Sequence, residues 1–274
     1  REDMPRQAGS CLSCQTLGIA MRVQRIGLTV EQLRSIPDAE RSLIVVLAHA
    51  LNEVNALNKL TFLSTRYSEE PQWLAHAEAL QTFMIAKPLV GKLNESWEVL
   101  QRGFFKTKLS KEYSDLLEKS AAEALGFLKG YFGRANLVNT VRNNFGFHYS
   151  LEHAKTAIPD DASPDDLAMY LHETNGNSLY YFAEYLMTKA LMEQISPENP
   201  EEALGILLDE MSAVIGHLNE FVQGLLFVIF SKYIGEETLR NSVTSVELGK
   251  VPESSSIRIP YFFEISRPVN AGAA

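Results

Sequence analysis

Apolar residues in the first half of the chain recur at steps of three and four positions. Within residues 41–65 they are Leu43, Val46, Leu47, Ala50, Val54, Leu57, Leu60 and Leu63. Because an α-helix has about 3.6 residues per turn, this spacing places them on one stripe that must be buried against another element. The same spacing returns over 71–100, where Pro88 and Gly91 are expected to kink or divide the helix. The pattern therefore requires helix packed on helix.

Further helices are predicted from periodicity and from capping residues. A third and a fourth helix are predicted over about 110–130 and 135–149, and four helices with short connections readily form an antiparallel bundle. Thr29 begins a capping box that predicts a short helix. Ser163 and Asn199 each stand before a proline that suits a first helical turn, so further helices are predicted to begin at these two points.

The two ends of the chain differ from this middle part. Residues 1–28 hold no sustained periodicity and are predicted to form a flexible leader. Residues 241–274 contain β-branched and aromatic runs, which favour an extended tail or a short hairpin. Residues 29–240 are then a single helical domain. The predicted fold class is all-α: an up-down helical bundle with additional C-terminal helices and a short extended or β tail.

The charge and the cysteine content narrow the classes of function. A net charge of −9 means that an anionic partner must be met by a local cluster of cations. No stretch approaches the ~20 apolar residues of a membrane span, so no membrane partner is expected. The few cysteines form no disulfide framework, which fits a location in the reducing cytoplasm. Cys11 and Cys14 lack the second cysteine pair of a structural zinc site, which favours two incidental thiols over a redox or metal role. No cofactor and no metal are expected.

A polar cluster, Arg142-Asn-Asn-Phe-Gly-Phe-His148-Tyr149, interrupts the otherwise apolar fourth helix. Common catalytic signatures such as HExxH, GxSxG and a glycine-rich phosphate loop do not occur in the sequence. Six residues rotate an ideal helix through about 600°, so Arg142 and His148 lie about 120° apart and cannot simply bind one ligand together. A second copy of the chain could bring its arginine to each histidine.

This segment resembles the signature of the HEPN superfamily, in which an arginine and a following polar residue precede a histidine by a few positions. Arg142, Asn143 and His148 fit that signature with five residues between the arginine and the histidine. HEPN domains carry the motif near the end of their last core helix, which corresponds to the predicted fourth helix. By architecture the resemblance covers about 41–150 and implies a HEPN-like core there. Many HEPN proteins are metal-independent endoribonucleases that dimerise, whereas others are inactive binding modules.

The resemblance implies a role for each residue of the motif. His148 would exchange a proton with the ribose 2′-OH or with the leaving 5′-oxygen. Arg142 would stabilise negative charge on the scissile phosphate, and Asn143 would orient the phosphate or the histidine. Four further residues are expected to support the site: Glu53, His49, Asn144 and Tyr149. Glu53 is expected to orient His148 or Arg142 across the bundle.

Two functions from different classes remain. The first is an endoribonuclease of HEPN type in a toxin or defence system, which acts on RNA as a homodimer and is held silent by an inhibitory protein partner. The second is a catalytically inert helical module that binds or scaffolds a partner. In the second case Arg142 would bond carbonyl groups at the helix end, and the helix dipole would favour His148 there. The acidic net charge counts modestly against RNA as a ligand.

Overall fold

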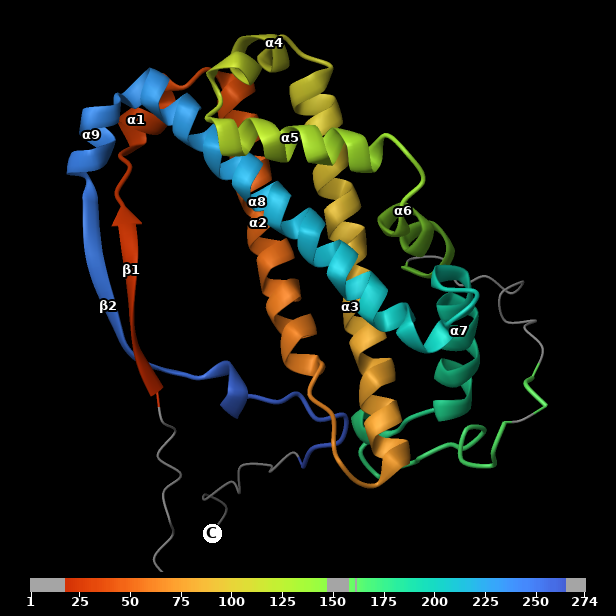
Figure 1. Cartoon of the computed structure of the whole chain (residues 1–274). Coiled ribbons are helices and arrows are strands. Elements are labelled where there is room, and N and C mark those ends of the chain that lie inside the picture. Colours follow the sequence, from red (N-terminus) through yellow and green to blue (C-terminus); the bar gives the residue numbers. More distant parts are fainter. Residues whose placement is uncertain (1–17, 147–157, 161, 265–274) are drawn as a thin grey trace, which may run out of the picture.

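The computed structural model describes residues 18–146, 158–160 and 162–264, and helices dominate them (Figure 1). The α-helices are α1 Val30–Ser35, α2 Asp38–Ser64, α3 Gln72–Leu100, α4 Leu109–Tyr113, α5 Lys119–Phe132, α6 Leu137–Val141, α7 Tyr181–Ile195, α8 Ala203–Ile234 and α9 Glu236–Asn241. Two π-helical turns, η1 Gln101–Phe105 and η3 Arg142–Gly146, follow α3 and α6. The strands are β1 Gly18–Ile26 and β2 Val243–Pro252. The all-α class predicted from periodicity is confirmed.

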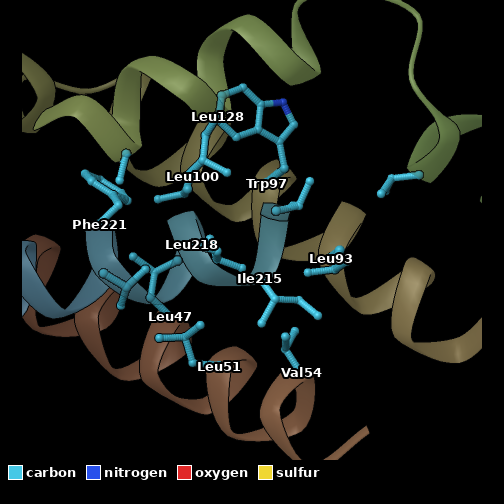
Figure 2. Packing of buried hydrophobic residues seen from close by; sticks show 14 of the residues in the cluster. Leu47, Leu51, Val54, Leu93, Trp97, Leu100, Leu128, Ile215, Leu218 and Phe221 are labelled. Carbon is cyan, nitrogen blue, oxygen red and sulfur yellow. The ribbon is translucent and has the colours of Figure 1, made fainter. Parts of the chain in front are cut away.

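Four helices build the core. In Figure 1, α2 and α3 run antiparallel side by side, α8 crosses both, and α5 lies across one end. Figure 2 shows leucine, valine, isoleucine and aromatic side chains from these four helices meeting in one cluster. Gly224 of α8 allows a close approach to α5, because a Cβ at this position would clash with the side chain of Ala121. Among the described residues, the fourth long helix of the bundle core is therefore α8.

Several predicted helix boundaries hold, but two predicted helices need correction. The helix predicted over about 110–130 is divided into α4, a 3-10 turn Ser114–Leu116 and α5, and the helix predicted after Ser163 does not form. Thr29 forms both hydrogen bonds of the capping box before α1, and α3 continues through Pro88 without division. The backbone N–H of Ser163 donates to Asp166 and the Ser163 hydroxyl accepts from the Asp166 N–H, but only a turn follows. The chain instead turns into a β-bridge between Tyr170 and Leu179, so the cap forms without a helix to continue it.

Strands β1 and β2 form a two-stranded ribbon beside the bundle (Figure 1). β1 and β2 pair antiparallel, with Val23 opposite Val246 and Arg22 bonded to Glu247. The prediction of a flexible leader over 1–28 is therefore wrong for the part that forms β1. The partner of β2 is this distant strand and not a second strand of the tail, because strand pairing is decided by contacts that no local pattern encodes.

Helix α8 combines length with high apolarity. With the turn before it, the stretch Pro200–Ile234 is long and apolar enough to cross a membrane by length and composition, with a mean hydropathy of 1.6 in its most apolar window. One side of the helix supplies buried residues from Ala203 to Ile229 to the bundle core. In this structure α8 acts as the central packing element of the bundle.

Candidate functional site

The motif that resembles the HEPN signature begins where α6 passes into η3, and α6 is held at its start by α8. Asn136 caps α6 by accepting from the N–H of Asn139 at 2.9 Å. Glu210 of α8 accepts from the N–H of Leu137 at 3.0 Å and from the Tyr131 hydroxyl. Burial raises the pKa of Tyr131, and its hydrogen bond to Glu210 raises it further. These polar contacts fix the helix that carries Arg142.

Arg142 lies at the surface in contact with α3. Its guanidinium donates to Glu95 at 3.2 Å and to the side-chain oxygen of Asn143 at 3.2 Å. The Arg142 side chain is 35% exposed and that of Glu95 is 53% exposed. Ion pairs at this level of exposure stabilise a protein by only about 0–1 kcal/mol. Exchanging Glu95 for another anion at the guanidinium therefore costs little free energy.

The predicted supporting residues on α2 make a separate contact to α3. Glu53 accepts from the Lys92 ammonium at 2.8 Å, and the His49 ring nitrogen lies 3.7 Å from the same carboxylate. The hydrogen bond from Lys92 lowers the pKa of the Glu53 carboxyl, against an opposing effect of burial. The carboxylate that contacts Arg142 is Glu95, so these contacts give Glu53 no orienting role towards the arginine.

Part of the predicted site is outside the described residues. His148 and Tyr149 are not described, so their contacts with Arg142 stay predictions. Asn143 is exposed and Asn144 is half-buried in η3. A π-helical turn widens the helix by one residue and is often found at functional sites. The structure therefore brings Arg142 and Asn143 together at the surface, while His49 and Glu53 lie at a neighbouring contact.

The sequence analysis missed the residues that hold the motif in place. Glu95 and Lys92 lie one helical turn apart on α3, and each pairs with an opposite charge on a different element. Their i,i+3 spacing indicates a shared face but not which partners lie opposite. Glu210 is separated from Leu137 by 73 positions. No local pattern in the sequence points to that contact.

The described residues contain no group of three or more histidine, cysteine, aspartate or glutamate side chains arranged to hold a metal ion. No protein-family model, no curated protein and no solved structure matches the chain. The chemistry of the residues around η3 is therefore the basis for a functional proposal.

Proposed function

We propose that the chain is a metal-independent endoribonuclease of HEPN type whose active site is built on η3 and the residues that follow it. The observation that carries the proposal is the placement of Arg142, which is about one-third exposed at a π-helical turn with Asn143 bonded to its guanidinium. His148 follows in sequence at the spacing of the HEPN signature. An anchored arginine beside a polar residue is suited to phosphate binding.

The proposed reaction needs no metal. The ribose 2′-oxygen attacks the adjacent phosphorus, the bond to the 5′-oxygen breaks, and the products are a 2′,3′-cyclic phosphate and a 5′-hydroxyl. His148 accepts the proton from the 2′-OH or returns one to the leaving 5′-oxygen. Arg142 donates to the phosphate oxygens as negative charge builds on them, with Asn143 holding the guanidinium in orientation. Glu95 is released from Arg142 when RNA binds.

The first experiment tests activity with the motif residues replaced. Purified protein is incubated with mixed RNA in EDTA, and the ends are examined for cyclic phosphates. Arg142→Ala and His148→Ala are expected to abolish cleavage while the fold is kept, because these groups act on the transition state. Arg102→Ala is the matched control, since Arg102 is an exposed arginine of η1 that bonds the Glu98 carbonyl. Activity that persists in EDTA in both motif variants contradicts the assigned roles.

The proposal includes a homodimer that brings the motifs of two subunits together, with RNA as the substrate. We also propose that the protein belongs to a cytoplasmic toxin or defence system and has an inhibitory protein partner. If each cleft combines the arginine of one subunit with the histidine of the other, mixed Arg142→Ala and His148→Ala subunits regain one intact cleft. Mixing the two inactive variants is then expected to restore part of the cleavage. A cleft built from one subunit regains nothing.

A second candidate function is an inert helical module that binds a partner protein. The observation that favours it is the pairing of Arg142 with Glu95 and of Lys92 with Glu53. Each of these two cations is already neutralised by a carboxylate. In this case wild-type protein shows no cleavage in the EDTA assay, and Arg142→Ala changes stability only. The same two measurements therefore separate the two functions.

A further inference from the structure

A second feature lies apart from η3, where the end of α3 meets α5. A surface hollow of about 330 Å³ is lined by Trp97, Gln101, Phe105, Lys106 and Lys129. The first three come from α3 and η1, Lys106 directly follows η1, and Lys129 comes from α5. Ligand pockets in proteins begin at about this size. The hollow is therefore large enough for one small ligand.

Aromatic rings form one wall of the hollow. Trp97 packs against Phe105 with ring centroids 5.3 Å apart and stacks on Phe132 at 4.7 Å. Figure 2 shows Trp97 extending from α3 towards Leu128 of α5. Trp97 is 8% exposed, whereas Phe105 is half-buried. A ligand thus meets the exposed part of Phe105 and an edge of the indole.

Two lysines border the same rings. The Lys129 ammonium lies 5.0 Å from the centroid of the Phe105 ring, which is a cation–π distance, and Lys106 is exposed. Within the described part of the chain, neither lysine forms an ion pair with a carboxylate. Arg142 differs from them in this respect, because Glu95 already binds it.

The sequence around the hollow is locally basic. Residues 101–111 contain four lysines and arginines and no aspartate or glutamate, in a chain whose net charge is −9. The cations of this stretch are Arg102, Lys106, Lys108 and Lys111. In an acidic protein an anion is bound where cations are concentrated locally. The end of α3 provides such a concentration beside an aromatic surface.

We propose that this hollow binds a nucleotide. The base lies against Phe105 and the indole edge of Trp97, the Gln101 amide bonds the base edge, and Lys106 and Lys129 bind the phosphate. An aromatic wall favours the planar base, and cations without carboxylate partners favour the phosphate without displacing an existing ion pair. This binding is independent of cleavage at η3. The bound group is either a free nucleotide or one nucleotide of a single-stranded RNA.

Tryptophan fluorescence tests the proposal directly. The chain has two tryptophans, so Trp73→Phe leaves Trp97 as the single reporter. This variant is titrated with AMP, adenosine, inorganic phosphate and a short single-stranded RNA. AMP is expected to change the Trp97 emission and to bind about tenfold more tightly than adenosine, because only AMP carries the phosphate. Raising the salt concentration is expected to weaken AMP binding but not adenosine binding.

Two double variants separate the hollow from general electrostatics. Lys106→Ala with Lys129→Ala is expected to weaken AMP binding about tenfold or more. Lys108→Ala with Lys111→Ala removes the same charge from the same region but leaves the lining intact, so it is expected to change binding little. Thermal melts of both variants check that the fold is kept.

Each titration and each double variant has a result that supports the nucleotide proposal or overturns it. No change in Trp97 emission with millimolar AMP overturns the proposal, as does equal weakening by the two double variants. Inorganic phosphate that competes as well as AMP overturns the part played by the base. Tighter binding of the RNA than of AMP supports the proposal with RNA as the ligand. Equal binding supports it with a free nucleotide as the ligand. Cleavage by the Lys106→Ala, Lys129→Ala variant is measured separately, so a failure here and a failure of the nuclease proposal remain distinguishable.

Discussion

The two π-helical turns end two helices of the same bundle but are held in different ways. In η1, Phe104 is fully buried and packs edge-on against Phe221 of α8 at 5.6 Å between ring centroids. In η3, the Arg142 guanidinium makes polar contacts to Asn143 and Glu95 at the surface. Apolar burial of Phe104 stabilises the first turn strongly, whereas the exposed polar contacts of Arg142 in the second are weak.

The cations beside η1 and the arginine of η3 also differ in their partners. Lys106 and Lys129 border an aromatic surface without a carboxylate partner in the described residues, whereas Arg142 is bound by Glu95. An anion can reach the lysines directly, but it must replace Glu95 at the arginine. The lysines beside η1 are thus open to an anion, whereas the arginine of η3 has a carboxylate partner that an anion must replace.

The largest effect is expected from removing the anchor of η1. Phe104→Ala should lower the free energy of unfolding by about 3–5 kcal/mol, because it leaves a cavity at a fully buried aromatic position. Urea unfolding followed by circular dichroism measures this loss. Phe62→Ala, at an exposed position of α2, is the control and should change stability little. A loss below about 1 kcal/mol in Phe104→Ala would show that the two turns are held equally weakly.

A smaller effect is expected from removing the contact that holds the helix before η3. Glu210→Ala leaves the Tyr131 hydroxyl and the Leu137 N–H without their acceptor and should cost about 1–3 kcal/mol. Glu210→Gln keeps an acceptor oxygen and should cost less. Hydrogen exchange is expected to accelerate at the amides of Leu137 and Val138 and to stay unchanged in α2. Unchanged exchange at these two amides would mean that α6 does not depend on Glu210.

Both turns have a buried tyrosine nearby, and this predicts a loss of stability at high pH. Burial raises the pKa of Tyr113, which follows η1, and of Tyr131, which precedes η3. The unfolded state releases tyrosine protons near pH 10, where the folded state still holds them, so the free energy of unfolding should fall as the pH rises above about 10. Below that pH the contribution is fully present. Urea melts over this range measure it.

The control for this pH dependence is a variant that removes one of the two tyrosines. Tyr131→Phe should make the decline above about pH 10 shallower, because one of the raised groups is gone. If the decline is as steep as in the wild type, Tyr131 titrates normally and the contact with Glu210 does not protect it.

The smallest effect is expected from the ion pair of η3. Arg142→Ala and Glu95→Gln should each change the free energy of unfolding by no more than about 1 kcal/mol, since both side chains are substantially exposed. A double-mutant cycle measures the coupling between them. A coupling well above about 1 kcal/mol would identify Arg142 as a structural residue and favour the inert module.

The sequence was sufficient for elements whose signals are local. The periodicity over 41–65 predicted α2, and Thr29 predicted the start of α1 with both cap hydrogen bonds present. Asn199 and Pro200 mark the start of the turn that leads into α8, although the Asn199 side chain forms no capping hydrogen bond. These predictions succeed because a helix forms hydrogen bonds within four residues and its caps lie within three.

Predictions from local sequence signals failed where contacts with a distant segment decide the structure. Ser163 forms its cap contacts, but Tyr170 bonds the backbone of Leu179 and stacks on Trp73 at 4.0 Å, so the segment stays out of a helix. The prediction of a leader missed β1 because its partner strand lies more than 200 positions away. The carboxylate that contacts Arg142 is Glu95, whereas Glu53 pairs with Lys92.

The sequence by itself determined that the chain is built of helices, where most of them begin, and that Arg142, Asn143 and His148 stand at a spacing that resembles the HEPN signature. Only the tertiary structure decided that α8 completes the core, that Glu210 anchors α6, and that Phe105 and Lys129 meet at one hollow. Local hydrogen bonds and periodicity involve residues a few positions apart, so they can be predicted from the sequence of neighbouring residues. Contacts between helices depend on which apolar faces pack together, and that choice is made by burial over the whole molecule.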